Sequence, residues 1–169
     1  MKKKPFVLML AILLTLALSA CSSNGDNSNG NKAEEPIEPT VSVKEMVDKM
    51  LADIEQPNLM ELDADGVKQQ YHVDLGLLEE YSVRIPMMNV KSNELAILKV
   101  KDAKDISDVE EAVKKRAADV QKSFEQYLPD QYENAKNYKI VTKGNYVLFV
   151  ISDQADAFVK SFERFFEQK

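Results

Sequence analysis

The sequence contains a single cysteine, Cys21, and a single histidine, His72, among its 169 residues. One cysteine excludes a disulfide within the chain, so a folded domain must be stabilised by its apolar core. With one histidine, a zinc or copper site would need carboxylates or methionines alone, and Met87-Met88 is too small a set for that. The five glycines form no phosphate-binding loop and no dinucleotide-binding fingerprint. We therefore expect neither a metal nor an organic cofactor.

The chain also has only one long apolar run, from Phe6 to Leu18. Its 13 residues are fewer than the roughly 20 that a membrane-spanning helix needs. Three lysines, Lys2 to Lys4, precede the run, and Ser19 and Ala20 are small residues directly before Cys21. This arrangement is typical of a secretory signal peptide over residues 1–20.

Leu18-Ser19-Ala20-Cys21 resembles the lipobox of bacterial lipoproteins. The resemblance implies cleavage between Ala20 and Cys21 and a diacylglyceryl group on the Cys21 thiol, whose two acyl chains would hold the protein stably on a bilayer. A catalytic thiol would need a positioned base and a pocket, which a cysteine at a signal-peptide border lacks. An ordinary signal peptide whose cleavage misses Cys21 is the remaining alternative. We predict a lipid anchor at Cys21 on the extracytoplasmic face of the cell membrane.

The predicted mature chain is acidic. Cleavage removes three lysines and leaves 19 basic and 28 acidic residues, a net charge of −9. Such a charge argues against a nucleic-acid partner. Residues 21–41 are polar, with Ile37 as the only large apolar side chain of the stretch from Ser22 to Thr40, so we expect a disordered tether with a span of about 25 Å. Residues 42–169 suffice for a single domain.

Hydrophobic patterns predict four strands. The runs Leu95–Val100 and Tyr146–Ile151 are apolar on both faces, which favours central positions. Alternation in Tyr81–Ile85 and Tyr138–Lys143 indicates strands with one buried face, and Gly144-Asn145 predicts a hairpin turn with a positive φ at Gly144.

Capping signals and apolar spacing predict the helices. A capping box at Ser42 begins a helix that ends before Pro57, and one at Ser107 begins a long helix that ends before Pro129. Further helices are expected from Asp63 to about His72, and after Asp153, where Phe158, Val159, Phe162, Phe165 and Phe166 form an apolar face.

Together these elements predict an α+β fold with a four-stranded antiparallel sheet in the order 1-2-4-3. Residues 94–115 and 145–166 share a pattern, which indicates two duplicated β-β-α units. The long helix would cross over between the second and third strands, and the helices would cover one face. The N-terminal helices would cover further surface, and the sequence leaves open whether this is the second face.

Two stretches stand out, ELAILKVKDAKD at 94–105 and KGNYVLFVISD at 143–153. Together with the Tyr81 strand, the tether and the lipobox, they resemble a family of bacterial lipoproteins from Gram-positive lineages. The family carries the domain of unknown function numbered 4358. The resemblance covers nearly the whole mature domain and implies no activity, so only Cys21 takes a role from it. The family has glycine where this chain has His72 in Tyr71-His72-Val73-Asp74.

One stretch, Glu61 to Gly66, has the acids and glycine that begin an EF-hand loop. Position 8 is Lys68, where an apolar residue belongs, and position 12 is His72, where the loop needs a bidentate Glu. The simpler interpretation is that Asp63 or Asp65 caps a helix.

His72 lies two residues before Asp74, yet no nucleophile sequence such as G-x-S-x-G accompanies them. We expect His72 to occupy a left-handed or irregular backbone position at a helix end. Met87-Met88 and the stripe of Phe162, Phe165 and Phe166 are expected to be core residues rather than ligand sites.

No catalytic residues emerge from these patterns. The sequence favours a non-enzymatic module that binds an unidentified protein or small molecule. An enzyme of the cell envelope with carboxylate catalysts is the alternative, and a structural spacer is a third possibility. A binding module predicts an apolar groove or a free strand edge, whereas an enzyme predicts a pocket with two carboxylates in different environments.

Overall fold

A computed structural model describes residues 38–167, which form an α+β domain with an antiparallel sheet. The sheet has five strands in the order β1-β2-β3-β5-β4, so the predicted four-stranded sheet was wrong. The additional strand is a short edge strand that pairs with β2. The strands are β1 (Leu59–Glu61), β2 (Leu78–Pro86), β3 (Glu94–Val100), β4 (Lys139–Lys143) and β5 (Tyr146–Ile151).

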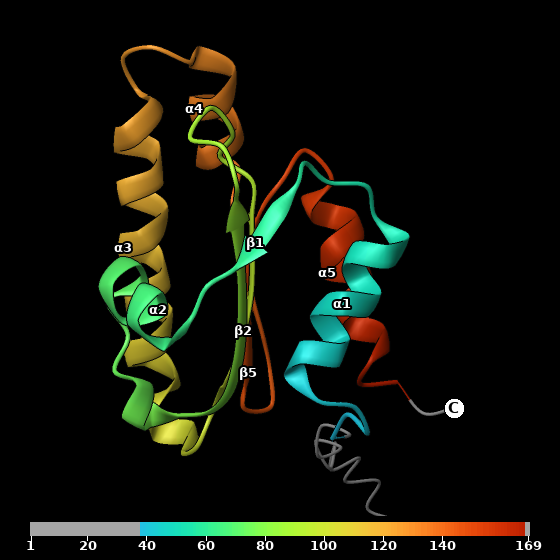
Figure 1. The fold of residues 1–169 in the computed structure, drawn as a ribbon. Coiled ribbons are helices and arrows are strands. Elements are labelled where there is room, and N and C mark those ends of the chain that lie inside the picture. Colours follow the sequence, from blue (N-terminus) through green and yellow to red (C-terminus); the bar gives the residue numbers. More distant parts are fainter. Residues whose placement is uncertain (1–37, 168–169) are drawn as a thin grey trace, which may run out of the picture. The chain divides into compact units, whose positions relative to one another are not determined.

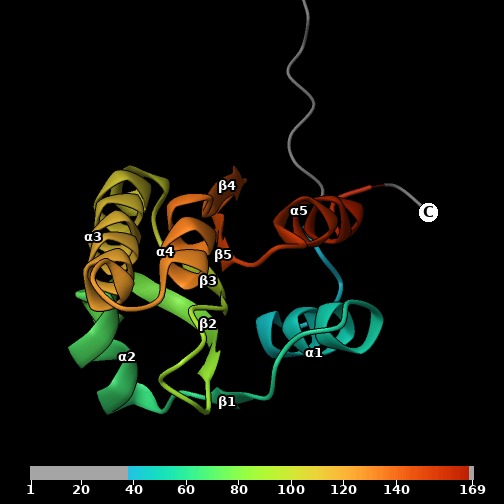
Figure 2. The ribbon, with the colours of Figure 1, turned by 90° about the horizontal axis from the view of Figure 1, so that it is seen from above.

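Helices cover both faces of this sheet, and not one face as predicted. In Figures 1 and 2, α2, α3 and α4 lie on one side of the strands, while α1 and α5 lie on the other. The helices are α1 (Val43–Asp53), α2 (Ala64–Tyr71), α3 (Ile106–Phe124), α4 (Pro129–Lys136) and α5 (Ala155–Arg164). Two 3-10 turns, η1 (Leu75–Leu77) and η2 (Ala103–Asp105), precede β2 and α3.

Strand alternation sends side chains into two separate cores. In β3, Ala96 and Leu98 pack against α2 and α3, whereas Leu95 and Ile97 pack against α1 and α5. The same alternation divides β5, whose six residues are all buried. The continuous apolar runs of these strands are therefore explained, because each strand is central and has a helix layer on both sides.

The two β-β-α units do not repeat in space. Because β3 and β5 are antiparallel neighbours, a twofold axis relating the units would stand perpendicular to the sheet and would keep both helices on one face. Instead, α3 packs in one core and α5 in the other. The predicted duplication is therefore not supported by the arrangement of the helices.

Several local predictions hold. The Ser42 hydroxyl accepts a hydrogen bond from the Glu45 N–H at the start of α1. Gly144 has φ 52° between the paired residues Lys143 and Tyr146, as the hairpin turn requires. However, the capping box at Ser107 was wrong, because α3 begins at Ile106.

Pro129 was also misinterpreted as a helix terminator. It is the first residue of α4, where a proline costs nothing because the first helical N–H has no partner within the helix. α3 itself ends at Phe124, and Tyr127 lies exposed after it instead of extending its buried stripe.

Candidate functional site

The predicted anchor lies outside the described residues. Ala20, Cys21 and the tether up to residue 37 belong to the part of the chain whose placement is not described. Among residues 38–167, none of the helices is both long enough and apolar enough to cross a bilayer.

The acids of the EF-hand-like stretch have other roles. The Asp63 side chain accepts a hydrogen bond from the Gly66 N–H at the start of α2, which confirms the capping interpretation. Glu61 forms ion pairs with Lys44 and Arg84. Within the described range, no group of three or more His, Cys, Asp or Glu residues could hold a metal ion.

His72 occupies a left-handed backbone position, φ 55° and ψ 18°, directly after α2, as predicted. Its ring Nε2 lies 2.6 Å from Asp119 Oδ2 on α3. Asp74 makes no hydrogen bond with His72 within residues 38–167, and it accepts one from the Gly76 N–H. The surface pair of His72 and Asp119 links the end of α2 to α3 and includes no serine or cysteine.

The predicted core residues divide into two groups. Phe162 is fully buried, and Phe165 and Phe166 pack against the same core, so the stripe on α5 is a packing face. Met87 and Met88 are not core residues. Their side chains are 64% and 57% exposed in the loop after β2, so this prediction was wrong.

The exposed methionines border a groove of about 400 Å³ between the loop after β2 and the second half of α3. We call it the methionine groove. Tyr127 is also exposed there, and its hydroxyl contacts the carbonyl oxygen of Asn89 at 3.3 Å. The groove is lined by Gln70, Ile85, Pro86, Met87, Met88, Asn89, Lys91, Glu94, Arg116, Val120, Ser123, Phe124 and Tyr127.

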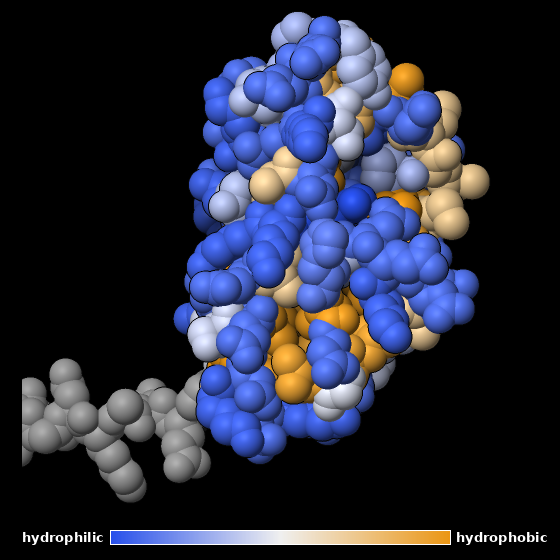
Figure 3. Space-filling model, turned by 90° about the vertical axis from the view of Figure 1, so that its left-hand side faces the viewer, coloured by the Kyte–Doolittle hydropathy of each residue, from blue (hydrophilic) through white to orange (hydrophobic). Residues whose placement is uncertain are grey.

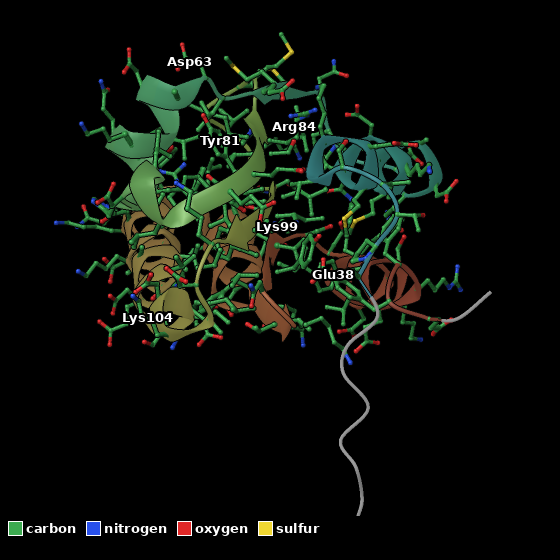
Figure 4. All side chains as sticks on the ribbon, turned by 90° about the horizontal axis from the view of Figure 1, so that it is seen from below. Glu38, Asp63, Tyr81, Arg84, Lys99 and Lys104 are labelled. Atoms are coloured by element: carbon green, nitrogen blue, oxygen red, sulfur yellow. The ribbon has the colours of Figure 1, made fainter. Side chains whose placement is uncertain are left out.

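The pictures show where sulfur-bearing and hydrophobic side chains reach the surface of the molecule. Figure 4 shows sulfur-bearing side chains in two places, one between α1 and α5 and the other projecting outward near β1. Figure 3 shows the face formed by α2 and α3, where most of the surface is hydrophilic and hydrophobic residues gather in separate areas, one below the centre and another along the upper part of the right-hand edge. Exposed apolar side chains that gather beside a groove are typical of interaction sites.

A buried polar network forms the floor of the methionine groove. The Tyr71 hydroxyl donates to Glu94 Oε2 at 2.7 Å, and Arg116 Nε donates to the same oxygen at 3.0 Å. The Arg116 Nη2 group pairs with the other oxygen, Glu94 Oε1. Arg116 also lies 5.5 Å from the centre of the Tyr71 ring. Three elements, α2, β3 and α3, are thus joined at one carboxylate.

Burial determines the ionisation of this network. Desolvation raises the pKa of Glu94 above its ordinary value, although the hydrogen bond and charge of Arg116 act in the opposite direction. Burial also raises the pKa of Tyr71, and the neighbouring Glu94 charge raises it further. The Tyr71 hydroxyl and the Glu94 carboxyl group are therefore bound to each other as hydrogen-bond donor and acceptor, and neither is a free acid or base.

The chemistry that this floor can perform is limited. Glu94 is the only acid among the described residues that line the groove, and both of its oxygens already accept hydrogen bonds. General acid–base catalysis by carboxylates needs two groups in different environments, or one that can reach a substrate. The methionine groove instead offers apolar side chains above a rigid polar floor, which suits binding.

Sequence reasoning missed this floor, although weak signals exist. Glu94 lies two and four residues before Ala96 and Leu98, so strand alternation places all three side chains on the same, core-facing side of β3. Arg116 lies three residues after Val113 on the apolar stripe of α3. Two opposite charges at core-facing positions are a sign of a buried pair.

Comparison with known protein families shows which family this chain belongs to. Residues 52–152 match the family described as the domain of unknown function DUF4358. The chain belongs to this family. Neither the search of curated proteins nor the search of solved structures finds a match. The DUF4358 match includes every residue that lines the methionine groove, from Gln70 to Tyr127. The groove is thus built within the DUF4358 domain.

Proposed function

We propose that this DUF4358 protein is a non-enzymatic binding module, anchored to the extracytoplasmic face of the cell membrane by a diacylglyceryl group on Cys21. Residues 21–37 would hold the domain away from the lipid headgroups, since Glu38 and Val41 of the expected tether already contact the folded domain. The domain would bind an apolar segment of a protein partner in the methionine groove. The observation that carries this proposal is the exposure of Met87, Met88 and Tyr127 around one groove.

The side chains of the groove suit an apolar partner. Methionine is unbranched and polarisable, so an exposed pair can adapt to partner side chains of different shape. Tyr127 is stacked on Phe124, with ring centres 5.8 Å apart, which offers a fixed aromatic surface beside the flexible methionines. A rigid anchor beside adaptable contacts is an arrangement that binding surfaces use.

The floor favours binding over catalysis. Because Glu94 is enclosed and fully hydrogen-bonded, it holds Arg116 in place and leaves no free carboxylate to act on a substrate. Arg116 Nη1 makes no hydrogen bond within residues 38–167, so this group can donate to a partner that enters the groove. The floor would then contribute orientation, while the apolar rim contributes most of the affinity.

The groove can be tested by photo-crosslinking in cells. Replacing Met88 with p-benzoylphenylalanine should give a discrete adduct with one partner protein. Replacing Lys104, which is exposed at the far end of the domain (Figure 4), is the matched control and should not give it. Adding Met87→Lys to the Met88 variant should weaken the adduct. The same adducts from both positions would contradict a specific groove.

The anchor is tested separately at Cys21. Cys21→Ala should abolish labelling of the protein by radioactive palmitate and should leave uncleaved precursor or released protein. Fractionation and labelling of the parent and the variant measure both effects. A variant that remains tightly bound to membranes after signal cleavage would show that the lipid is not the anchor.

A further inference from the structure

A second groove lies at the end of the sheet where β3 begins and β5 ends. Figure 1 shows α4 and the loops after α1 and β5 at this end. The groove has a volume of about 570 Å³ and is built from four segments that are far apart in the sequence. We call it the amide groove, because five of its ten lining residues are asparagine or glutamine. It is lined by Glu55, Gln56, Pro57, Lys91, Asn93, Asp130, Gln131, Asn134, Asp153 and Gln154.

The amide side chains are held by hydrogen bonds between segments. Gln131 Oε1 accepts from the Ser92 N–H at 3.0 Å, which fixes the start of α4 against the chain before β3. Asn134 Nδ2 donates to Ser92 Oγ at 3.0 Å, and Asn93 Nδ2 donates to Gln56 Oε1 at 3.0 Å. These bonds orient the amides before any ligand arrives, which lowers the entropic cost of binding.

Acceptor oxygens remain for a ligand. Asn93 is only 6% exposed, yet its Oδ1 accepts no hydrogen bond within residues 38–167. Asn134 Oδ1 likewise accepts none. No fully enclosed side-chain polar atom lacks a partner in this part of the chain, so both oxygens are accessible to solvent, and both residues line the groove. The side chains of Asn93 and Asn134 are thus held in place by their own hydrogen bonds, and each keeps an acceptor oxygen for a ligand.

The lining of the groove is slightly acidic, because three acids, Glu55, Asp130 and Asp153, face one base, Lys91, for a formal charge of −2. Asp130 lies in the first turn of α4, and Asp153 lies just before α5, where negative charge offsets the positive end of each helix. A hydrogen bond from Gln131 lowers the pKa of Asp130, so this acid is ionised. The charge of Lys91 also lowers the pKa of Asp130, whereas Glu55 has no ion-pair partner within residues 38–167. An anionic ligand is therefore disfavoured, and the groove lacks a cluster of acids that could hold a metal ion.

We propose that the amide groove binds a neutral carbohydrate chain. Sugar hydroxyls both donate and accept hydrogen bonds, as the amides do, and they need no compensating charge. No set of His, Cys, Asp or Glu in the described range could hold a metal there. Because Pro57 is the only apolar residue in the lining, little apolar surface is buried and a dissociation constant in roughly the millimolar range is expected.

The test is a nuclear magnetic resonance titration of the purified full chain with chitotetraose and, separately, maltotetraose. The side-chain amide signals of Asn93, Gln131 and Asn134 should shift in a saturable way with at least one sugar. Signals of the Met87 and Met88 methyl groups should stay in place, which separates this site from the methionine groove.

The double variant Gln56→Ala, Gln154→Ala should weaken sugar binding at least tenfold. Gln69→Ala makes the same chemical change on an exposed part of α2 and should leave binding unchanged. Tetra-alanine serves as a peptide probe. The absence of saturable shifts with both sugars would overturn the proposal, and so would saturation by tetra-alanine alone or equal losses in the double variant and the Gln69→Ala control.

Discussion

Two sheltered arginines, one on each face of the sheet, pair with acids in opposite environments. On the α3 face, Arg116 pairs with Glu94, whose side chain is 2% exposed. On the α1 face, where Figure 4 labels it, Arg84 pairs with Asp48 and Glu61, whose side chains are 53% and 46% exposed. The arginines are similarly enclosed, so the difference between the two sites lies in the acids.

Folding changes the pKa values of Glu94 and Glu61 in opposite directions. Burial raises the pKa of Glu94 even though Arg116 is bound to it. A hydrogen bond from Lys44, with a further contribution from Arg84, lowers the pKa of Glu61. A charge pair thus stabilises the ionised acid where water still reaches it, and only offsets desolvation where water is excluded. The network at Glu94 fixes how α2, β3 and α3 fit together more than it adds stability.

Removing the enclosed arginine should have the largest effect. Arg116→Met would leave Glu94 buried without its partner and should lower the free energy of unfolding by about 3–5 kcal/mol. Urea denaturation at neutral pH measures this loss. The double variant Arg116→Met, Glu94→Gln should recover part of it, because the buried charge is gone. A single variant as stable as the parent would mean that Glu94 is solvated.

The next largest effect should be on the pH dependence of stability, to which Glu94 and Glu61 contribute with opposite signs. Because the folded-state pKa of Glu94 is raised, its contribution to stability is full below the ordinary value of 4.5 and is lost as pH rises through the folded-state pKa. The pKa of Glu61 is lowered, so its contribution is present above 4.5 and is lost as pH falls through the folded-state pKa.

Urea denaturation across a pH series on Glu94→Gln and Glu61→Gln checks these signs. Glu94→Gln should reduce the loss of stability on the way from pH 4.5 to neutral, and Glu61→Gln should reduce the loss below pH 4.5. If both variants changed the pH dependence of stability with the same sign, the proposed difference between Glu94 and Glu61 would be wrong.

A smaller effect is expected at the second arginine. Arg84→Met should cost about 1 kcal/mol, because Asp48 and Glu61 remain solvated and the aliphatic stem is replaced by a similar one. Thermal unfolding beside Arg116→Met gives the direct comparison. A loss as large as that of Arg116→Met would show that exposure of the acids does not decide the cost.

The smallest effect should come from a pair that is exposed on both sides. His72→Gly removes the contact with Asp119 but also relieves the left-handed backbone, since glycine adopts positive φ freely. The free energy of unfolding should change by no more than about 1 kcal/mol. Melting curves and the crosslinking and sugar-binding assays on this variant provide the check, and a folded variant without binding would give His72 a functional role.

The sequence predicted what short-range patterns specify. The apolar runs of β3 and β5, the turn at Gly144 and the left-handed His72 follow from residue type and local spacing. β1 escaped prediction because three residues are too few to show alternation. α4 escaped because Pro129 is compatible with both a helix end and a helix start.

Neither groove could be predicted, because both depend on distant segments. The Glu94–Arg116 pair joins residues 22 positions apart, and Ser92 meets Gln131 across 39 positions. Which face each helix covers determines these contacts. Periodicity marks Glu94 and Arg116 as core-facing residues, but neither periodicity nor capping shows which helix layer covers which face of the sheet. The placement of α5 opposite α3 is the clearest example, since similar local patterns lead to opposite layers.

The attachment of α1 has a mechanical consequence. This helix packs on the sheet through side chains, and near its start Glu38 accepts a hydrogen bond from the Tyr146 hydroxyl while Glu80 accepts one from the Val43 N–H. A pulling force applied at the N-terminal side would load these contacts one after another, as in peeling. The antiparallel strand pairs and the α2–α3–α4 layer would not carry that load until α1 had detached. Tension would therefore remove one helix first and leave both edges of the methionine groove in place.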